Sequence, residues 1–450
     1  MRALVLFALA GCAAEAAPTP PAPSMKLLAE VKAWAIESSG GKLVVVDDGF
    51  LSVTAIDAAT GKQAWTTKVQ KAPARGAHGL VVDRTNVLAW FGEKAHVLDA
   101  QTGKVSTSYD TVLNGSGSGC GLWVKEGVCA NVCQCSFQLA DCVTGKQLSP
   151  SYQGKYVEEF DPDGGMSSGC WGFDGWPLGT AGKLALIAVD DPKPHVAGID
   201  LATKKETWKR DMMASPQAYE TGHSADGKTC WFTDYDKSLA VVDCATGKEL
   251  WKTPGIKGNG RHVVIPIPGR GLFEQTLTTA TLHAERTGKA LWTIQLPSET
   301  VSWPKGSAPV VDLPLPTGVD GAMALAILDP ATGKQLAKVP IPKGADLIPD
   351  TGGAFFIAQN KELVAFDAAG TVTARAVLPA FNMELGATLI AMGRDPDVVV
   401  VDKKTLKTLL RLPGPNLSFE VEGELGTGRV VIWQYDAKTV GRARLYAVTN

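Results

Sequence analysis

The residues best suited to chemistry gather in one acidic and aromatic stretch, between residues 157 and 176. Its members are Glu158, Glu159, Asp161, Asp163, Trp171, Asp174 and Trp176. Carboxylates can hold a Ca²⁺ ion, but Asp161-Pro-Asp163-Gly-Gly lacks the full acidic spacing of a calcium loop. We therefore interpret the stretch as a long solvated loop, which could serve as a binding surface.

Cysteines form a second reactive group, nine in all. Eight of them follow the N-terminal region: Cys120, Cys129, Cys133, Cys135, Cys142, Cys170, Cys230 and Cys244. A metal or redox cluster around Cys129, Cys133 and Cys135 is one interpretation, yet that spacing matches no strong zinc pattern and no histidine lies nearby. An even number in an exported chain favours disulfides instead.

Other catalytic signatures are missing from the sequence. Its six histidines show no metal-ligand spacing, although a closed ring could gather them at its centre: His78, His96, His195, His223, His262 and His283. There is no Gly-x-Ser-x-Gly elbow and no Walker-type phosphate loop. The 44 basic and 46 acidic residues give a net charge of −2 without a basic run, which argues against a nucleic-acid partner. No catalytic, metal or cofactor-binding residue is predicted.

A repeated phrase organises the chain that must carry these residues. Its first copy reads Asp57-Ala-Ala-Thr60-Gly61-Lys62-Gln-Ala-Trp65. The copies begin at Asp57, Asp99, Asp141, Asp200, Asp243, Glu285, Asp329, Asp367 and Asp402. A short β-branched run precedes each copy, glycine permits the tight turn, and the leading Asp can hydrogen-bond forward onto it. The tryptophans at matching offsets are expected to pack between neighbouring units: Trp65, Trp208, Trp251 and Trp292.

The spacing of the copies predicts the fold. Most lie 42 to 44 residues apart, with 59 between Asp141 and Asp200 and shorter intervals at the end. About 40–45 residues is the length of one four-stranded propeller blade. We therefore predict an all-β protein, a single large β-propeller of four-stranded blades. Propellers usually have up to about eight blades, but the copies and the length predict up to ten.

The two chain ends are expected to close the ring together. Lys32-Ala33-Trp34 looks like the last strand of a unit that lacks its turn, and Arg442 to Val448 looks like a third strand without a partner. Pairing them would build one blade from both termini. Such closure leaves few open sheet edges.

At Ala-Thr-Gly-Lys-x-x-Trp the chain resembles the PQQ-like β-propeller repeat family. That family includes quinoprotein alcohol dehydrogenases, which carry pyrroloquinoline quinone, and the non-enzymatic lipoprotein of the outer-membrane β-barrel assembly machinery. Eight blades are usual in it. Its quinone-binding members typically use adjacent cysteines, a Ca²⁺ site and an Asp base. This chain has no Cys-Cys pair and no Cys-x-x-Cys-His haem motif, so the resemblance leans toward the non-catalytic branch and implies no cofactor.

The N-terminus has the features of a lipoprotein signal. Residues 1–11 contain a charged start and a short apolar run, and Leu9-Ala-Gly-Cys12 resembles the bacterial site of lipid attachment. Cys12 is thus the predicted lipidated residue, residues 12–25 an Ala/Pro-rich tether and residues 26–450 the propeller. Because Ala13 rather than Asp follows the cysteine, the pattern resembles outer-membrane sorting in the cell envelope.

The repeat also assigns cysteine pairs. Cys142 and Cys244 follow the leading Asp of their copies, and Cys129 and Cys230 lie 13 and 14 residues upstream on the preceding strand. Bridges Cys129–Cys142 and Cys230–Cys244 are predicted, because neighbouring strands bring such residues within disulfide reach. The remaining four are expected to form two further bridges of open connectivity: Cys120, Cys133, Cys135 and Cys170.

The leading functional hypothesis is a lipid-anchored, monomeric ring that acts as a protein-interaction scaffold in the periplasm or at the outer membrane. By resemblance alone, it would assist outer-membrane protein assembly. A quinone- or metal-dependent oxidoreductase is a second hypothesis. The third is a glycan or small-ligand binder that uses the acidic and aromatic stretch.

Overall fold

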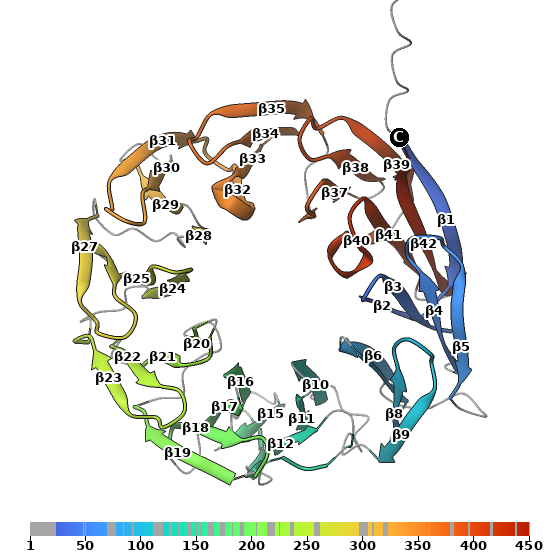
Figure 1. The fold of residues 1–450 in the computed structure, drawn as a ribbon, viewed down its shortest axis with the longest axis horizontal. Helices are drawn as coiled ribbons and strands as arrows, with labels where there is room; N and C mark the ends of the chain where they lie inside the picture. The colour runs from blue at the N-terminus through green and yellow to red at the C-terminus, as the bar shows by residue number, and fades with distance from the viewer. Residues whose placement is uncertain are drawn as a thin grey trace, which may run out of the picture.

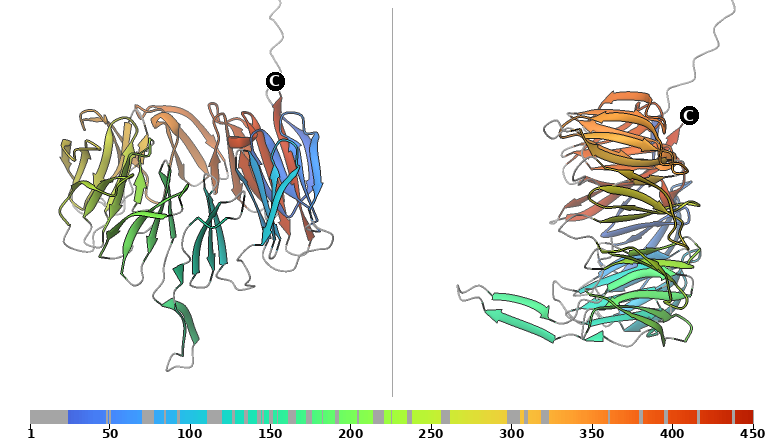
Figure 2. Two further views of the ribbon diagram at one scale, coloured as in Figure 1. Left: turned by 60° about the horizontal axis from the view of Figure 1, so that its bottom comes forward. Right: turned by 90° about the vertical axis from the view of Figure 1, so that its left-hand side faces the viewer.

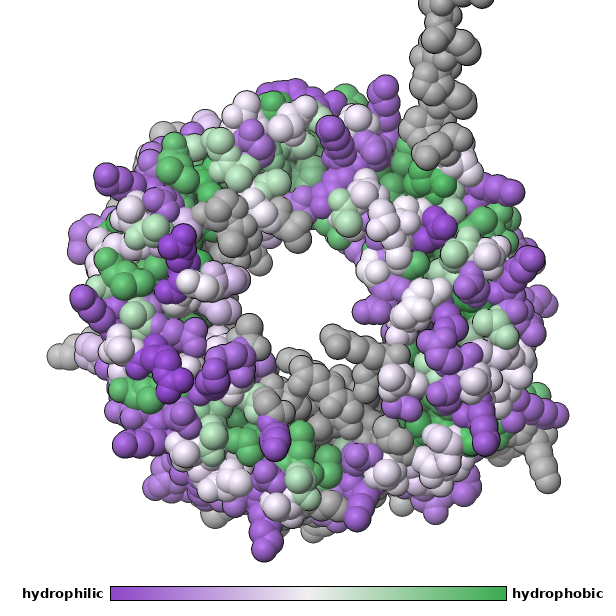
Figure 3. All heavy atoms as spheres, viewed as in Figure 1, coloured by the Kyte–Doolittle hydropathy of each residue, from purple (hydrophilic) through white to green (hydrophobic). Residues whose placement is uncertain are grey.

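The computed structural model shows a ring of antiparallel β-sheets (Figure 1). It describes residues 24–449 except for positions 48, 50, 70–77, 84, 92–93, 111–119, 126–127, 134–135, 142–143, 145, 149–151, 154, 161–165, 172–175, 182, 190–192, 204, 214–220, 225, 235–237, 256–261, 297–304, 308–309, 318–322, 360, 379–381, 395–396, 415–416 and 437–438. Seen down its shortest axis, the ring is hollow at its centre (Figure 3). Within the described residues no helix is long and apolar enough to cross a membrane.

Within the part of the chain that the structure describes, ten four-stranded sheets form the ring, and we number them as blades in chain order. Blade 1 contains β2 (Ala35–Ser39), β3 (Lys42–Val46), β4 (Ser52–Asp57) and β5 (Gln63–Lys68). Blade 2 contains β6 (His78–Asp83), β7 (Asn86–Phe91), β8 (Lys94–Asp99) and β9 (Val105–Asp110). Blade 3 contains β10 (Cys120–Lys125), β11 (Val128–Cys133), β12 (Ser136–Asp141) and β13 (Tyr152–Gln153). A separate hairpin of β14 (Lys155–Phe160) and β15 (Met166–Trp171) follows.

The next three blades continue the same strand order. Blade 4 contains β16 (Trp176–Ala181), β17 (Leu184–Val189), β18 (His195–Asp200) and β19 (Lys205–Asp211). Blade 5 contains β20 (Thr221–His223), β21 (Thr229–Thr233), β22 (Leu239–Asp243) and β23 (Glu249–Lys252). Blade 6 contains β24 (Val263–Ile267), β25 (Gly271–Gln275), β26 (Thr279–His283) and β27 (Ala290–Gln295).

Three more blades and a composite one complete the ring. Blade 7 contains β28 (Lys305–Ser307), β29 (Val310–Pro316), β30 (Met323–Leu328) and β31 (Gln335–Ile341). Blade 8 contains β32 (Asp346–Pro349), the 3₁₀ turn η2 (Thr351–Gly353), β33 (Phe355–Gln359), β34 (Glu362–Phe366) and β35 (Val372–Val377). Blade 9 contains β36 (Met383–Leu385), β37 (Leu389–Arg394), β38 (Asp397–Asp402) and β39 (Thr408–Pro413). Blade 10 contains β40 (Leu417–Val421), the 3₁₀ turn η3 (Gly423–Leu425), β41 (Arg429–Asp436), β42 (Thr439–Thr449) and β1 (Ser24–Lys32).

Blade 10 is built from both ends of the chain, which confirms the expected pairing of the terminal strands. β1 pairs antiparallel with β42, from Ser24 opposite Thr449 to Lys32 opposite Arg442. One detail differs, because Trp34 lies outside β1 and is 39% exposed. Leu28, rather than Trp34, lies against the turn glycine of blade 1. A Cβ on Gly61 would lie 2.5 Å from the Leu28 carbonyl oxygen.

The hydrophobic core lies between neighbouring blades rather than inside any one sheet. One cluster joins Val44, Ala55 and Trp65 of blade 1 to Val87 and Leu98 of blade 2. Middle strands have a neighbour on both faces, so they read as continuous apolar runs. In β38 the run from Val398 to Val401 is fully buried. Each blade therefore depends on the next for its stability.

The repeated phrase folds as predicted, into a tight turn between the third and fourth strands. Asp57 Oδ1 accepts hydrogen bonds from the Thr60 amide at 2.8 Å and the Thr60 hydroxyl at 2.7 Å. Gly61 adopts a φ of 71° and donates to the Asp57 carbonyl at 2.8 Å. The hydrogen bonds from Thr60 lower the pKa of Asp57. The turn is thus set locally by the Asp, Thr and Gly of the phrase.

The sixth copy is shifted by one residue from the expected alignment. There the turn is closed by Ala284, whose amide donates to the Lys289 carbonyl at 2.9 Å and whose carbonyl accepts from Gly288 at 2.9 Å. Ala284 therefore takes the place of the leading Asp, and Glu285 takes the place after it. Backbone hydrogen bonds keep the turn where the acidic side chain is missing.

The insertion between blades 3 and 4 was expected to be a long loop, and this expectation is wrong. β14 and β15 form a two-stranded antiparallel hairpin. Figure 2 shows that it projects from one face of the ring, opposite the face near which the C-terminus is marked. The antiparallel register, from Lys155 opposite Trp171 to Phe160 opposite Met166, places most of the stretch in paired strands.

Candidate functional site

Tryptophans join the blades at several junctions by docking onto the next repeat turn. Trp65 of β5 lies over Gly103 of blade 2, where a Cβ would come within 2.5 Å of the ring. Its Nε1 donates to the Ala100 carbonyl at 3.1 Å. The same hydrogen bond joins Trp208 to Cys244 at 2.8 Å, Trp251 to Glu285 at 2.7 Å and Trp292 to Pro330 at 3.0 Å. Glycine is required beneath the indole because any side chain would occupy its place.

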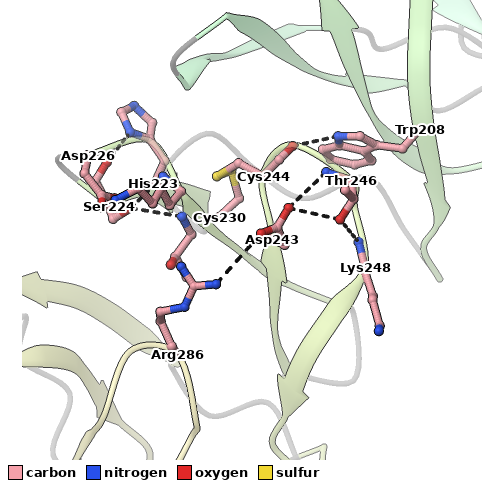
Figure 4. The surroundings of a disulfide bond; sticks show 12 residues. Trp208, His223, Ser224, Asp226, Cys230, Asp243, Cys244, Thr246, Lys248 and Arg286 are labelled. Atoms are coloured by element: carbon pink, nitrogen blue, oxygen red, sulfur yellow. Dashed lines mark hydrogen bonds and ion pairs between the residues drawn. A yellow bond between two sulfur atoms is a disulfide. The ribbon is translucent and has the colours of Figure 1, made fainter.

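A disulfide supports one of these docks (Figure 4). Cys230 of β21 is bonded to Cys244, the residue after the leading Asp243, with their Cα atoms 5.1 Å apart. This is the pair expected from the repeat. Because the Cys244 carbonyl accepts the Trp208 indole N–H, the bridge holds the acceptor of the dock between blades 4 and 5.

The equivalent pair in blade 3 stays a prediction, because Cys142 lies outside the described residues. The backbone register agrees with it: Cys129 is opposite Ala140, as Cys230 is opposite Val242. Ala140 lies two residues before Cys142, just as Val242 lies two residues before Cys244. Cys12, the predicted lipid attachment site, also lies outside the described residues.

The predicted acidic and aromatic surface is divided between two sheets. Glu158 and Glu159 lie on β14 and Trp171 ends β15, whereas Trp176 begins β16 in blade 4, opposite Ala188. Three more of its members fall outside the described residues: Asp161, Asp163 and Asp174. The structure therefore brings the strand residues into a projecting hairpin and separates Trp176 from them.

The junction between blades 8 and 9 lacks the tryptophan dock. The position four residues after the turn glycine holds Ala374, and the next turn carries Leu406 in place of glycine, with a φ of 55°. A cavity of about 1010 Å³ lies here. Its apolar lining includes Phe356, Ala365 and Phe366 beside Ala374. The described part of the chain thus has an open pocket at a position where four other junctions hold an indole. The junction of blades 7 and 8 also lacks an indole, but there Val339 and Ile327 pack against the turn glycine Gly370.

One wall of this cavity is fixed by a buried ion pair. Lys403 Nζ donates to Asp350 Oδ1 at 2.7 Å and to the Gly386 carbonyl at 2.7 Å. Their side chains are 13% and 9% exposed. At such burial the pair is held in one geometry, so the cavity has a rigid polar end beside its apolar lining. The exposed residues Lys404 and Thr405 complete the rim.

Two of the six histidines converge, but on a carboxylate rather than at the ring centre. His262 Nε2 lies 2.7 Å from Glu274 Oε1, and His283 Nε2 lies 2.9 Å from Glu274 Oε2. Burial alone would raise the pKa of Glu274, but the hydrogen bonds from both histidines lower it to about 2. Thr253 of the previous blade also donates to Glu274, at 3.2 Å. The network therefore joins blades 5 and 6.

Carboxylates with the opposite pKa shift lie on first strands of adjacent blades, which face the centre of the ring (Figure 1). Burial and the nearby Glu420 of β40 raise the pKa of Glu37 on β2 to about 7. Burial also raises the pKa of Glu420 itself and of Glu384 on β36. Among the described residues, no three His, Cys, Asp or Glu side chains are arranged to hold a metal ion.

Comparison with known proteins identifies the family. The family model described as outer membrane protein assembly factor BamB matches residues 25–210 and again residues 192–377. The chain belongs to this family. The resemblance of its repeat to PQQ-like propellers is thereby confirmed. No curated protein matches the chain.

Similar solved structures come from proteins of different kinds. BamB from Moraxella catarrhalis is 11% identical, with a TM-score of 0.37 over 94% of this chain and 99% of that one. The quinohemoprotein alcohol dehydrogenase ADHIIG from Pseudomonas putida HK5 is 13% identical, with a TM-score of 0.37 over 94% and 76%. A eukaryotic initiation factor is 11% identical, with a TM-score of 0.46 over 77% and 88%. None of these likenesses bears on activity.

Proposed function

We propose that this protein is a non-catalytic scaffold of the cell envelope, anchored by a lipid on Cys12, which holds proteins together during outer-membrane protein assembly. The family match carries the proposal, since it spans residues 25 to 377 in two overlapping parts. A large rigid ring suits the role, because a specific interface needs only about 800 Å² per partner.

The hairpin β14–β15 is the proposed contact element. Its two strands pair with one another and form a separate sheet, so each presents an outer edge. Unpaired edges can accept a strand from another chain through main-chain hydrogen bonds. Figure 2 places this hairpin on the face opposite the marked C-terminus, where Thr449 pairs with Ser24 of β1. A tether leading from Ser24 to a lipid would leave the hairpin face open to partners.

Crosslinking in intact envelopes tests the proposal. Photo-crosslinkers placed at Glu158 and Glu159 of the full-length protein are expected to capture a component of outer-membrane protein assembly. The same group at Leu336, an exposed position of β31 in another blade, serves as the matched control. Loss of the protein is expected to lower the amount of folded outer-membrane barrels. Recovery of no envelope protein, with barrel levels unchanged, would refute the scaffold role.

A second measurement separates this role from the oxidoreductase hypothesis. The purified protein is incubated with pyrroloquinoline quinone and Ca²⁺, and its absorbance and metal content are then measured. The scaffold proposal expects no stoichiometric cofactor after gel filtration. A bound quinone in one-to-one ratio would favour the enzyme.

A further inference from the structure

We infer that the cavity between blades 8 and 9 is a receptor for an aromatic side chain, tryptophan above all, carried by a partner polypeptide. The inference rests on the proposed scaffold function and names the chemistry of the partner. The inference starts from one position of the repeat. At four described junctions this position holds a tryptophan, whereas here it holds Ala374 beside a cavity.

The four filled junctions show what this architecture binds. At each of them an indole lies against the turn glycine of the next blade and donates its N–H to the carbonyl of the residue after the leading position. In blade 9 that residue is Lys403, which follows Asp402. Its backbone is fixed, since the Lys403 amide donates to the Thr388 carbonyl at 2.8 Å. The acceptor side of a dock is therefore in place without its tryptophan. Because Leu406 stands where the filled junctions have glycine, a bound ring would lie beside Leu406 rather than flat on the turn.

The unfilled volume is larger than one missing ring. Leu406 replaces the turn glycine and is 3% exposed, so its side chain already fills part of the space above the turn. About 1010 Å³ still remains open beside it. This volume is at the upper end of small-ligand pockets. A ring together with the chain segment that carries it suits this space better than a single free ring.

The surface of the cavity fits an aromatic side chain on a peptide. Phe356, Ala365, Phe366 and Ala374 provide an apolar lining, against which an aromatic ring gains most from burial. The rim carries Thr405 and Lys404 at exposed positions. These groups can hydrogen-bond the main chain of a bound segment, while the Asp350–Lys403 pair keeps the polar end neutral. The formal charges of the whole lining also cancel, because it holds three acidic and three basic residues: Asp350, Asp367, Asp402, Arg375, Lys403 and Lys404. The recognised feature is thus the ring and its donor group.

Peptide binding to the full mature protein tests the inference. The probe is a labelled Gly/Ser peptide with one central tryptophan, followed by fluorescence anisotropy. Saturable binding is expected, and replacing the tryptophan by alanine should abolish it. A 1-methyltryptophan peptide lacks the N–H donor, so we expect about two- to twelve-fold weaker binding, the range for one hydrogen bond.

A paired substitution closes the cavity from within. Ala374→Trp with Leu406→Gly rebuilds the dock found at the other junctions, and it should weaken peptide binding by about tenfold or more. Leu336→Trp adds an indole at an exposed position of another blade and should leave binding unchanged. Should the double variant not fold, Ala387→Trp fills the cavity from an exposed rim position without altering the core.

The outcomes separate this inference from the proposed function. Failure of the tryptophan peptide to bind, or equal binding to a folded closed-cavity variant, overturns the aromatic receptor. Envelope crosslinking at the hairpin does not depend on the cavity and can still succeed. Conversely, specific peptide binding with no partner captured in the envelope supports the receptor and contradicts the scaffold.

Discussion

Blades 4 and 5 meet through Trp208, whereas blades 8 and 9 meet at the same repeat position through Ala374. The first junction is closed: Trp208 is 8% exposed, and its Nε1 is 2.8 Å from the Cys244 carbonyl. The second contains a cavity of about 1010 Å³. Both turns are intact, since Asp402 Oδ1 accepts from the Thr405 amide at 2.7 Å and Asp243 Oδ1 accepts from the Thr246 amide at 3.1 Å.

The difference separates two tasks that the repeat performs. Local hydrogen bonds set the turn, and they persist in blade 9 although Leu406 replaces glycine. The tryptophan joins one blade to the next, and burying an aromatic side chain of 150–250 Å² is worth about 4–6 kcal/mol. A ring of ten blades has other junctions to hold it, so one of them can stay open for binding.

The largest effect is expected from breaking a closed junction. Trp208→Ala should lower the free energy of unfolding by about 3–5 kcal/mol, because it removes a buried ring and leaves a cavity. Urea unfolding followed by circular dichroism measures this loss. Trp34→Ala is the matched control, since Trp34 is 39% exposed. Equal losses for the two variants would show that docking contributes nothing.

A buried carboxyl at the junction of blades 7 and 8 makes stability depend on pH. Asp312 of β29 is 1% exposed, and within the described residues neither of its carboxylate oxygens has a hydrogen-bond partner. Burial raises its pKa from 3.8 to about 7. The folded state therefore holds this proton more tightly than the unfolded chain, and its contribution is complete below about pH 4 and lost as the pH rises to about 7.

Asp312→Asn sharpens the contrast, because asparagine cannot ionise. The shift of about three pKa units corresponds to up to about 4 kcal/mol, so the fall in unfolding free energy between pH 4 and 7 should shrink by at most that amount in the variant. Raised pKa values at Glu37 and Glu420 add slopes of the same sign in both proteins. The measured quantity is thus the difference between the two proteins in how their unfolding free energy changes with pH. Parallel pH profiles would exclude Asp312, and exposed Asp110→Asn is the control.

Breaking the Cys230–Cys244 bond should cost about 3 kcal/mol, the value for a closed loop of about 15 residues. The bond also holds the acceptor carbonyl of Trp208. Cys230→Ala with Cys244→Ala and Trp208→Ala should therefore give non-additive losses when combined. Strict additivity would show that the bridge and the dock are independent, and unchanged stability after reduction would contradict the structural role.

The ring and its turns could be predicted because their signals are local. Asp57, Thr60 and Gly61 determine a turn by contacts within five residues, and repetition of that turn gives the blade length. Closure was also predictable, since incomplete units at both termini need a partner. The docking role of Trp65 followed from its constant offset.

Features that depend on pairing between strands or on contacts between blades were harder to predict. Glu274 and His262 are 12 residues apart and meet His283 only once two strands pair. The cavity did leave a signal: Ala374 and Leu406 depart together from the Trp and Gly of the phrase. Aligning the weak copies with the strong ones would have marked that junction. The hairpin was missed because its acidic residues were interpreted as a solvated loop.

The smallest effect is expected from closing the open junction. Ala374→Trp alone should destabilise the protein, because the new indole would clash with the side chain of Leu406. At the filled junctions, a Cβ added to the turn glycine would lie about 2.5 Å from the docked ring, and Leu406 has a side chain at that position. Leu406→Gly alone should also destabilise it, by loss of a buried leucine.

Together these two substitutions rebuild a dock and relieve the left-handed strain at Leu406, so we expect a net gain of about 1 kcal/mol in unfolding free energy. The double-mutant cycle measures the coupling, which should be favourable and larger than either single loss. Additive losses would mean that the indole does not dock in blade 9. The open junction would then differ from the closed ones in more than the two residues named.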